Sequence, residues 1–426
     1  MQILKEEIKI EEITIKENDQ DVKLYYCYTN KFKTFYTRCV FLLDFDYVLK
    51  PVNTVLSYLL DRTTSIHPIE EEFIGYLFNN YDMFHDVGIS TAGLTDKFSF
   101  STGTINTKYI HDNVNLLEVA TDVLKETIYH PNFDPEIFEE IKSSLIENII
   151  NKQNNKVSVA YNRFIDNMFK DELYNKKIMR DPNLFSKITL DDVKKAYENL
   201  LNAEHFYFYI GEDSLEDVVK AFSKINLNKS LTCNYITIDK ETKEITSPTV
   251  IQEDYNVNQS HLFIGFRTNI YTDHEDYYAM HLFNIMLGGS GSSDLFEIVR
   301  EEHGLAYNIY STYSPTKGFI IIDGGISKDN FDKTLDLIRN IIIKYQTGDI
   351  DVDKLELTKY EIITDIKANL DSINSTSEQA INYALTGVYR FAKEKIDKIN
   401  NITIEDIKRV ANEIVLDTIY FMRGTK

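Results

Sequence analysis

One sequence pattern occurs twice, about half a chain length apart, and it constrains the fold more than any other feature. Residues 188–195 read Ile-Thr-Leu-Asp-Asp-Val-Lys-Lys, and residues 402–409 read Ile-Thr-Ile-Glu-Asp-Ile-Lys-Arg. In both copies a threonine suited to cap a helix precedes an acidic residue at the third helical position, which is the arrangement of a capping box. Each copy leads into an apolar segment typical of a strand, at residues 205–211 and 418–424. The repeat therefore predicts two homologous domains, each ending with a capped helix and a strand.

The length of the chain agrees with two domains. With 426 residues, the chain exceeds the size at which a single hydrophobic core keeps growing. A polar stretch without strong helical periodicity predicts a boundary, so we expect an N-terminal domain over residues 1–225, a connector over residues 226–258 and a C-terminal domain over residues 259–426. The mixture of strand-like and helical segments indicates an α+β fold. In this fold each α/β domain has a mainly antiparallel sheet with helices packed on one face.

Local patterns predict individual elements within these domains. Pro51 and Pro68 favour the start of two helices, which we expect to run to Leu60 and Tyr81. Periodic apolar residues elsewhere predict strands at residues 89–101 (two strands around a turn), 204–211, 261–266 and 319–325, and a helix at residues 273–287.

Composition argues against several classes of partner. The formal net charge of −21 and the pI near 4.9 argue against nucleic acid and anionic membranes as partners.

The first residues are charged and lack the apolar core of a signal peptide, and no run of about 18 apolar residues predicts a transmembrane helix. Cys27, Cys39 and Cys233 are odd in number and widely spaced, which is typical of a reducing compartment. We therefore expect a cytoplasmic protein without nucleic-acid or membrane partners.

The most specific functional pattern lies early in the second half. A turn rich in glycine and serine, residues 288–293, leads into a charged amphipathic helix that Gly304 is placed to end, and residues 306–311 then read as a strand. Arg300 and Tyr307 are seven positions apart in this segment. An arbitrary pair of this kind would be a solvated arginine and a buried strand tyrosine. A guanidinium and a phenol are also directional donors, so together they can hold a peptide carbonyl and its developing oxyanion.

This segment resembles the second-half signature of the insulinase-like zinc peptidases, the family that includes pitrilysin and the mitochondrial processing peptidases. The resemblance rests on Gly-Gly, Leu-Phe, Arg-Glu and Gly-Leu-Ala-Tyr in this order at matching spacing within residues 288–307. It implies two domains that form a clam-like chamber around a peptide, and it implies that Arg300 and Tyr307 reach into an active site. It also implies that substrate contacts the turn formed by Gly288, Gly289, Ser290, Gly291 and Ser292. The resemblance covers nearly the whole chain and is weaker in the first half.

The zinc motif of active family members is absent from the first half. Those members carry His-x-x-Glu-His on a helix and a further glutamate downstream, so that two imidazoles and a carboxylate hold zinc and the inner glutamate acts as general base. The nearest string here is His67-Pro68-Ile69-Glu70-Glu71, in which Glu71 takes the place of the second histidine. Pro68 favours a helix start, which leaves His67 off the helix face. Glu147 matches the position of the third ligand, but without the histidines we expect a solvated or salt-bridged carboxylate and no metal site.

Other cofactor and catalytic patterns are also incomplete. The one His-Glu pair, His274-Glu275, has Tyr278 where the order His-Glu-x-x-His requires a second histidine. The turn at residues 288–293 has no Gly-Lys-Ser/Thr ending, so it does not match a phosphate-binding loop.

A chain with the Arg/Tyr pair and without the zinc ligands resembles the non-catalytic subunit of a two-chain bacterial peptidase, and it is similar to the subgroup of YfmF-like proteins. We expect a pseudo-peptidase that is inactive alone and supplies Arg300, Tyr307 and a peptide-binding surface to a homologous zinc-bearing subunit. Zinc is expected only in that partner, and the substrate is expected to be a peptide or an unfolded protein. Two alternatives stay open. One is a non-hydrolytic peptide-binding or assembly scaffold, and the other is a zinc metallopeptidase with unconventional ligands such as His67 and Glu147.

Overall fold

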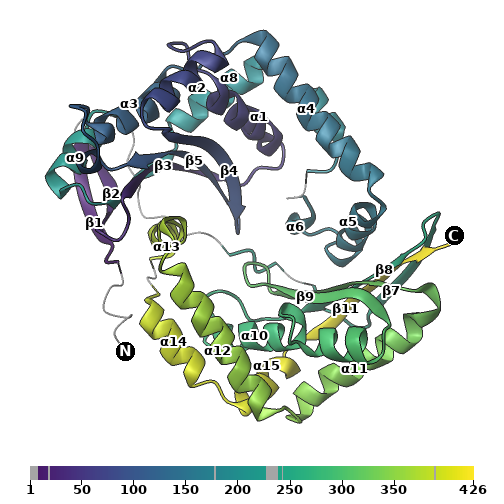
Figure 1. Cartoon of the computed structure of the whole chain (residues 1–426). Coiled ribbons are helices and arrows are strands. Elements are labelled where there is room, and N and C mark those ends of the chain that lie inside the picture. The colour runs from purple at the N-terminus through teal and green to yellow at the C-terminus, as the bar shows by residue number, and fades with distance from the viewer. Residues whose placement is uncertain (1–7, 18–19, 177–178, 227–237, 242, 388–389) are drawn as a thin grey trace. The chain divides into compact units, whose positions relative to one another are not determined.

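The computed structural model divides the chain into two compact units that interleave along the sequence (Figure 1). It describes residues 8–17, 20–176, 179–226, 238–241, 243–387 and 390–426. Unit 1 comprises residues 1–148, 179–237 and 367–392, and unit 2 comprises residues 149–178, 238–366 and 393–426.

The compact units differ from the expected contiguous domains 1–225 and 259–426. Residues 149–178 pack with the second sheet and residues 367–392 pack with the first, so each half of the chain contributes a helical segment to the other unit. Within the expected connector 226–258, residues 227–237 and 242 lie outside the described residues.

The sheet of unit 1 has six strands in the order β1-β2-β6-β3-β5-β4. The β2–β6 pair is parallel and the other pairs are antiparallel. The strands are β1 (Glu11–Glu17), β2 (Gln20–Tyr28), β3 (Thr34–Asp44), β4 (Phe84–Ala92), β5 (Thr95–Ile105) and β6 (Glu204–Gly211). The accompanying helices are α1 (Leu49–Arg62), α2 (Glu70–Asn79), α3 (Leu116–Tyr129), α4 (Pro135–Asn154), α7 (Pro182–Ser186), α8 (Leu190–Leu201), α9 (Leu215–Phe222), α13 (Ile373–Thr386) and the 3₁₀ turn η2 (Thr107–Tyr109).

The sheet of unit 2 has five strands in the order β7-β11-β8-β10-β9, of which β7 and β11 are parallel. The strands are β7 (Thr249–Tyr255), β8 (Ser260–Arg267), β9 (Ala306–Ser314), β10 (Phe319–Ile326) and β11 (Val415–Gly424). The helices are α5 (Lys156–Met168), α6 (Leu173–Lys176), α10 (Tyr277–Asn284), α11 (Phe331–Thr347), α12 (Val352–Asn369), α14 (Ala392–Asn400) and α15 (Ile404–Asn412), with the π-helices η3 (Ile285–Gly289) and η4 (Leu295–Glu302) and the 3₁₀ turn η5 (Lys328–Asn330). The second sheet repeats the order of the last five strands of the first, with the parallel pair in the same place.

Local signals in the sequence explain where many of these elements begin and end. Both expected capping boxes are present: the Thr189 hydroxyl accepts from the backbone N–H of Asp192 at 3.2 Å, and the Thr403 hydroxyl accepts from that of Asp406 at 3.3 Å. The expected strand at residues 204–211 coincides with β6. Helix α1 begins two residues before Pro51, where Asp46 Oδ1 accepts from the backbone N–H of Leu49 at 3.2 Å. Helix α2 begins two residues after Pro68.

Each sheet is covered on both faces, whereas the sequence predicted helices on one face. Helices α1 and α3 pack on one face of the first sheet, and α13 covers apolar side chains such as Phe206 and Phe208 on the other. In unit 2, α10, α11 and α15 pack on one face, and α5 covers Phe263 and Tyr420 on the other. The additional helix is needed because the central strands carry apolar side chains on both faces. Within the described part of the chain, no helix combines the length and apolar character needed to cross a membrane.

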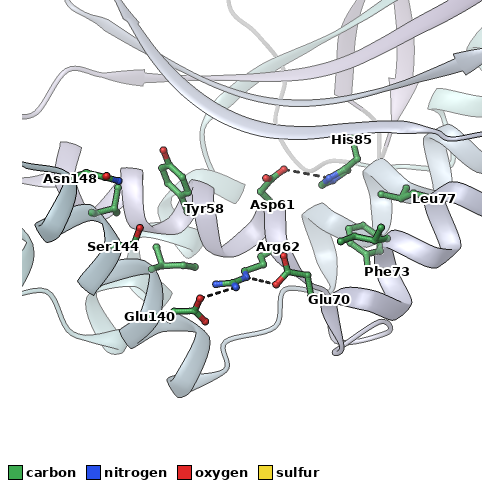
Figure 2. Close-up of a pocket in the computed structure, with 13 residues that line it drawn as sticks. Tyr58, Asp61, Arg62, Glu70, Phe73, Leu77, His85, Glu140, Ser144 and Asn148 are labelled. Carbon is green, nitrogen blue, oxygen red and sulfur yellow. Dashed lines mark hydrogen bonds and ion pairs between the residues drawn. The ribbon is translucent and has the colours of Figure 1, made fainter. Parts of the chain in front are cut away.

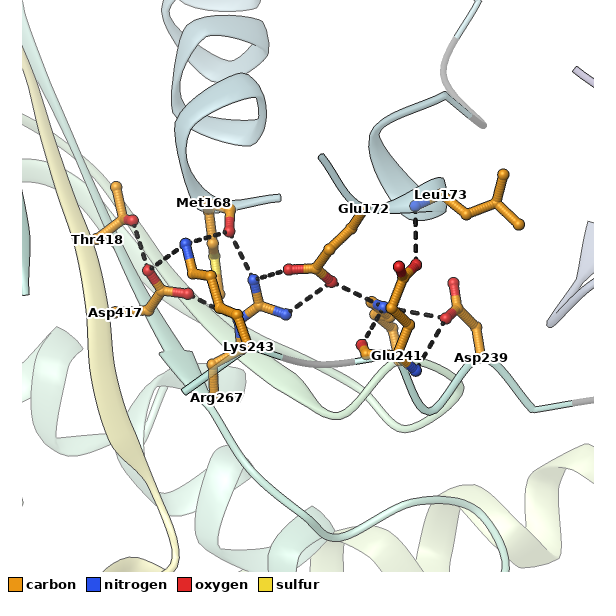
Figure 3. Close-up of polar contacts among 10 residues, drawn as sticks. Met168, Glu172, Leu173, Asp239, Glu241, Lys243, Arg267, Asp417 and Thr418 are labelled. Carbon is orange, nitrogen blue, oxygen red and sulfur yellow. Dashed lines mark hydrogen bonds and ion pairs between the residues drawn. The ribbon is translucent and has the colours of Figure 1, made fainter. Parts of the chain in front are cut away.

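A buried ionic network attaches the segment after α5 to the second sheet (Figure 3). Arg267 on β8 donates through Nη2 to Glu172 Oε1 at 2.6 Å and through Nε to Asp417 Oδ2 at 2.7 Å. Lys317 Nζ lies 2.8 Å from Glu172 Oε2 and 3.0 Å from Asp239 Oδ1. These side chains are all at most 7% exposed, so each charge depends on its partners to offset the loss of solvation.

We predict that Arg267→Gln destabilises unit 2 by about 3–5 kcal/mol, because it leaves Glu172 and Asp417 buried with too little compensating charge. Hydrogen exchange of the β8 backbone amides, compared at matched pH, measures this opening directly. Arg163→Gln is the control, because the Arg163–Glu253 pair in the same unit is 52% and 27% exposed and its loss should matter far less. Equal protection in the two variants would contradict the importance given to the network.

Candidate functional site

The expected turn at residues 288–293 is partly helical. Helix α10 continues directly into η3, which includes Gly288 and Gly289, and a short turn then leads into η4. Both η3 and η4 are π-helices. This wide form of helix is rare in proteins overall, and many of its occurrences are at functional sites. Gly304 has φ of +59° and ends η4 as expected, since its N–H donates to the carbonyl of Arg300 at 3.1 Å.

Gly288 is explained by packing against β9. The glycine is buried, and a Cβ atom at this position would lie 2.6 Å from Leu295 Cδ1 and 2.6 Å from the backbone N of Ser311. Only a residue without a side chain allows η3 to approach β9 this closely. Gly289 and Gly291 are exposed, and Gly291 has open space where a Cβ would be. The five expected substrate-contacting residues therefore lie in two different environments.

The two serines of the turn are linked to α12. Ser290 Oγ and Ser292 Oγ are 3.0 Å apart, and Ser292 Oγ donates to Glu361 Oε1 at 3.2 Å. Both serines remain partly exposed. The turn is therefore held in place by a carboxylate and still presents polar groups to solvent.

Arg300 lies on η4 with its side chain 39% exposed. The guanidinium lies over the Phe296 ring, 4.4 Å from its centroid, and Nε is 3.4 Å from Glu301 Oε1. Among the residues that the structure describes, the ring and ion-pair contacts of this guanidinium both come from its own helix. The guanidinium is therefore available to a ligand without breaking a contact to another element.

A β-bulge turns Tyr307 out of the core. In the β9–β10 ladder, Ala306 pairs with Ile326 and Asn308 pairs with Gly325, so Tyr307 has no partner residue. Burial along β9 follows the bulge: Ala306 is buried, whereas Tyr307 and Asn308 are both exposed. Tyr307 is 80% exposed, which excludes a buried strand tyrosine. An unpaired residue at a bulge is a common means of redirecting a side chain.

A hydrogen-bonded cluster that the sequence did not predict lies on the strands beside Tyr307. The Tyr310 hydroxyl donates to Asp323 Oδ2 at 2.6 Å, and His261 Nε2 contacts Asp323 Oδ1. Partial burial and this hydrogen bond raise the pKa of Tyr310 above its usual range. Because the Tyr310 proton is engaged by Asp323, the phenol oxygen can accept a hydrogen bond from a ligand.

Asn308 adds a hydrogen-bond donor beside the acceptor of Tyr310. Its Oδ1 accepts from the backbone N–H of Gly325 at 3.2 Å, so its amide nitrogen is left as the donor. Asn308 and Tyr310 are separated by one residue on β9 and both are exposed, as expected of side chains on one face of a strand. Together they present a donor and an acceptor, which suits the C=O and N–H groups of a peptide backbone.

The residues considered for zinc are His67 and Glu147, which lie in the first half of the chain, far in sequence from Arg300 and Tyr307. His67 Nδ1 is 2.7 Å from Glu126 Oε1, and α2 begins only at Glu70, so His67 precedes the helix as expected. Glu147 is exposed on α4. Across the described ranges, no group of three or more His, Cys, Asp or Glu side chains is placed to hold a metal ion.

Comparison with known proteins supports the family resemblance. Residues 187–362 match the family model described as Peptidase M16 inactive domain. The "Probable inactive metalloprotease YmfF" of Bacillus subtilis is 28% identical over 407 residues, which are 93% of this chain and 95% of that protein. The expected subgroup name, YfmF, therefore has two letters transposed.

Solved structures support the fold. A conserved protein from Enterococcus faecalis has a TM-score of 0.88 at 24% identity, covering 98% of this chain and 99% of that one. The "peptidase M16 inactive domain" from Pseudomonas fluorescens has a TM-score of 0.76 at 16% identity, covering 98% of both chains. The resemblance and the α+β fold with two mainly antiparallel sheets are confirmed, and the relatives support a non-catalytic, peptidase-like protein.

The buried environment of Gly288 and the exposed environment of Gly291 generate a prediction. Gly288→Ala should destabilise unit 2 by about 1–3 kcal/mol, because the added methyl group overpacks the contact with β9. Gly291→Ala should change stability by less than about 0.5 kcal/mol, because its Cβ enters open space. Urea denaturation of the two variants compares the same chemical change at both sites, and equal effects would contradict the packing role of Gly288.

Proposed function

Because this chain is M16-like and resembles a probable inactive metalloprotease, we propose that it is the non-catalytic subunit of a two-chain peptidase. In this proposal it supplies Arg300 and Tyr307 to the active site of a homologous zinc-bearing partner. The observation that carries the proposal is the bulge in β9, which leaves Tyr307 80% exposed a few residues after the accessible Arg300. Neither side chain is needed to fill the core.

The chemistry proposed for these residues is the binding of a peptide at the partner's zinc site. The partner would supply the zinc, and that zinc would polarise a bound water. Arg300 would hold the carbonyl oxygen next to the scissile bond through its N–H groups, and Tyr307 would donate to the oxyanion as it forms. The Asn308 amide and the Tyr310 oxygen would bind the peptide backbone, and the serine turn would contact the substrate further along.

The expected compartment remains the cytoplasm. Cys27 and Cys39 are buried free thiols, which supports a reducing environment. The net charge of −21 supports a partner and substrate other than nucleic acid or an anionic membrane.

We predict that Arg300→Ala lowers peptide turnover by the mixed subunits about ten- to a thousandfold, because it removes an oxyanion donor. The assay combines this chain with a homologous subunit that carries His-x-x-Glu-His and follows cleavage of an unfolded protein. Arg339→Ala is the matched control, because Arg339 is an exposed helix arginine in the same unit. Unchanged turnover in Arg300→Ala would remove the role given to Arg300, and no turnover in any pairing would favour the peptide-binding scaffold instead.

We further predict that the purified chain, dialysed without chelator, carries much less than one zinc ion per molecule. His67 is engaged by Glu126, and Glu147 is exposed without a histidine pair beside it in the sequence. Elemental analysis measures the zinc content. A stoichiometric zinc that is lost in His67→Ala or Glu147→Ala would instead favour a metallopeptidase with unconventional ligands.

A further inference from the structure

A cleft of about 490 Å³ in unit 1 is lined by residues of α1, α2, α4 and β4, and its charged groups satisfy one another (Figure 2). Arg62 donates to Glu70 Oε2 at 2.5 Å and to Glu140 Oε1 at 2.9 Å. His85 Nδ1 lies 3.4 Å from Asp61 Oδ1. Because each of these carboxylates has a partner within unit 1, their charges require no ligand.

A different groove, in unit 2, is almost entirely apolar. It has a volume of about 180 Å³ and lies between α11 and the strands β8 and β11, and nine of its eleven lining residues are apolar. The two polar residues are already engaged: Gln346 Nε2 donates to the carbonyl of Ala411 at 3.1 Å, and Arg339 Nη1 is 3.3 Å from Asp336 Oδ1. The groove therefore presents apolar surface without an unpaired charge.

This apolar surface reaches the solvent on both sides of the groove. Ile343 lines the groove from α11 and is 45% exposed. Ile419 lines it from β11 and pairs with Val250 on the edge strand β7, and Val250 is 55% exposed. Directly paired residues on neighbouring strands lie on the same face of a sheet. Apolar side chains that are exposed together are typical of surfaces that bind other proteins.

The corresponding position in unit 1 is filled by a helix. Strands β6 and β11 have the same place in their sheets, and Tyr207 of β6 corresponds to Phe421 of β11 in the internal repeat. Helices α3 and α11 also correspond, because α3 follows β5, which pairs with β3, and α11 follows β10, which pairs with β8. Helix α9 lies beside α3, with the Phe222 ring 4.9 Å from the Tyr207 ring (Figure 1). In unit 2, the matching flank of α11 lines the open groove instead.

Helix α9 shows what kind of surface fits such a position. Val218, Phe222 and Ile225 are each at most 1% exposed. Their spacing of i, i+4 and i+7 places them on one face of a helix. The segment extends to the end of α3, where the Tyr129 hydroxyl donates to the carbonyl of Asn226 at 2.7 Å. One short amphipathic helix is therefore enough to cover the flank of α3.

We propose that the groove between α11 and β11 binds a short amphipathic helix of another protein, in the way that α9 packs beside α3. Valine-, isoleucine- or phenylalanine-sized side chains of that helix cover Ile343 and Val250, and its polar face remains in solvent. The groove includes neither Arg300 nor Tyr307, so the proposal does not rest on peptidase activity.

Two other occupants fit the observations less well. The volume of about 180 Å³ is below the range of about 300–1,000 Å³ that is usual for small-molecule sites, whereas a helix needs only a shallow groove. A second copy of this chain is disfavoured, because two chains with a net charge of −21 repel each other. Helix α9, whose apolar face would match, is also already buried in unit 1.

Methyl NMR of the full chain tests this proposal, because isoleucines line the groove. The chain is labelled at the isoleucine δ1 methyl groups, and the probe is a peptide with the sequence of residues 214–225, blocked at both ends. The Ile343 and Ile419 signals should shift on titration, whereas that of Ile66, which is 54% exposed in unit 1, should not. A comparison peptide with Val218→Ser and Phe222→Ser should bind at least about tenfold more weakly, because it has lost two apolar anchors.

A matched pair of variants locates the binding surface. Ile343→Ser should raise the dissociation constant of the probe at least about fivefold, followed at the Ile419 methyl group, because it removes apolar area from the contact. Ile66→Ser is the control, since Ile66 is a similarly exposed isoleucine outside the groove. Circular dichroism confirms folding, which should persist because both side chains are partly in solvent.

Four results would overturn the proposal. Shifts confined to isoleucines outside the groove would place the peptide elsewhere, and no shift at about 1 mM peptide would show that the groove does not accept a helix. Equal binding of the serine peptide would exclude an apolar contact. Groove signals that shift with protein concentration, without peptide, would assign the groove to a second copy. These measurements do not involve a zinc-bearing subunit, so they are distinguishable from a failure of the proposed function.

Discussion

The buried guanidinium of Arg267 is the interaction on which the arrangement of the chain depends most. It lies on a strand of the second sheet and binds Glu172, which follows α5 in the first half of the sequence, and Asp417 at the start of β11. Three distant segments must therefore come together before any of these charges is compensated. The corresponding contribution to unit 1 is α13, whose Ala380, Ile381 and Leu385 pack against the first sheet. Each repeat thus completes the unit formed mainly by the other, which explains why the compact units are not contiguous.

The two repeats share a topology but differ at the edge of each sheet. Strand β4 pairs with β5 in an uninterrupted register, whereas its counterpart β9 has a bulge against β10 at Tyr307. The neighbouring helices differ as well, because η3 and η4 are π-helical and Gly288 allows η3 to approach β9 closely. The features associated with Arg300 and Tyr307 therefore belong to the second repeat. The two units share one strand order, and only the second carries the surface proposed to act on a peptide.

Features determined by short-range chemistry could be predicted from the sequence, and features determined by long-range pairing could not. The capping boxes at Thr189 and Thr403 depend on residues three positions away, and both are present. By contrast, the contact of His261 and Tyr310 with Asp323 depends on the registers of two strand pairs. Gly288 illustrates a different limit, because glycine is equally suited to a turn and to close packing. The amphipathic pattern of α5 predicts a buried face but does not indicate which sheet will cover it.

The Arg/Tyr pair contributes little to the fold, and this is the strongest physical reason to look for a ligand. Tyr307 is 80% exposed and therefore adds little apolar burial, while the ion-pair partner of Arg300 is the adjacent, exposed Glu301. The surrounding structure is nevertheless specific: a bulge exposes Tyr307, Gly304 in a left-handed conformation ends η4, and Gly288 allows the preceding helix η3 to pack closely against β9. A fold that needed only stability could bury this tyrosine in a regular strand. Instead, strand pairing is lost at Tyr307, and the Tyr307 and Arg300 side chains are both accessible to solvent. This is the arrangement that the proposed half-site, acting on a peptide held by a second subunit, requires.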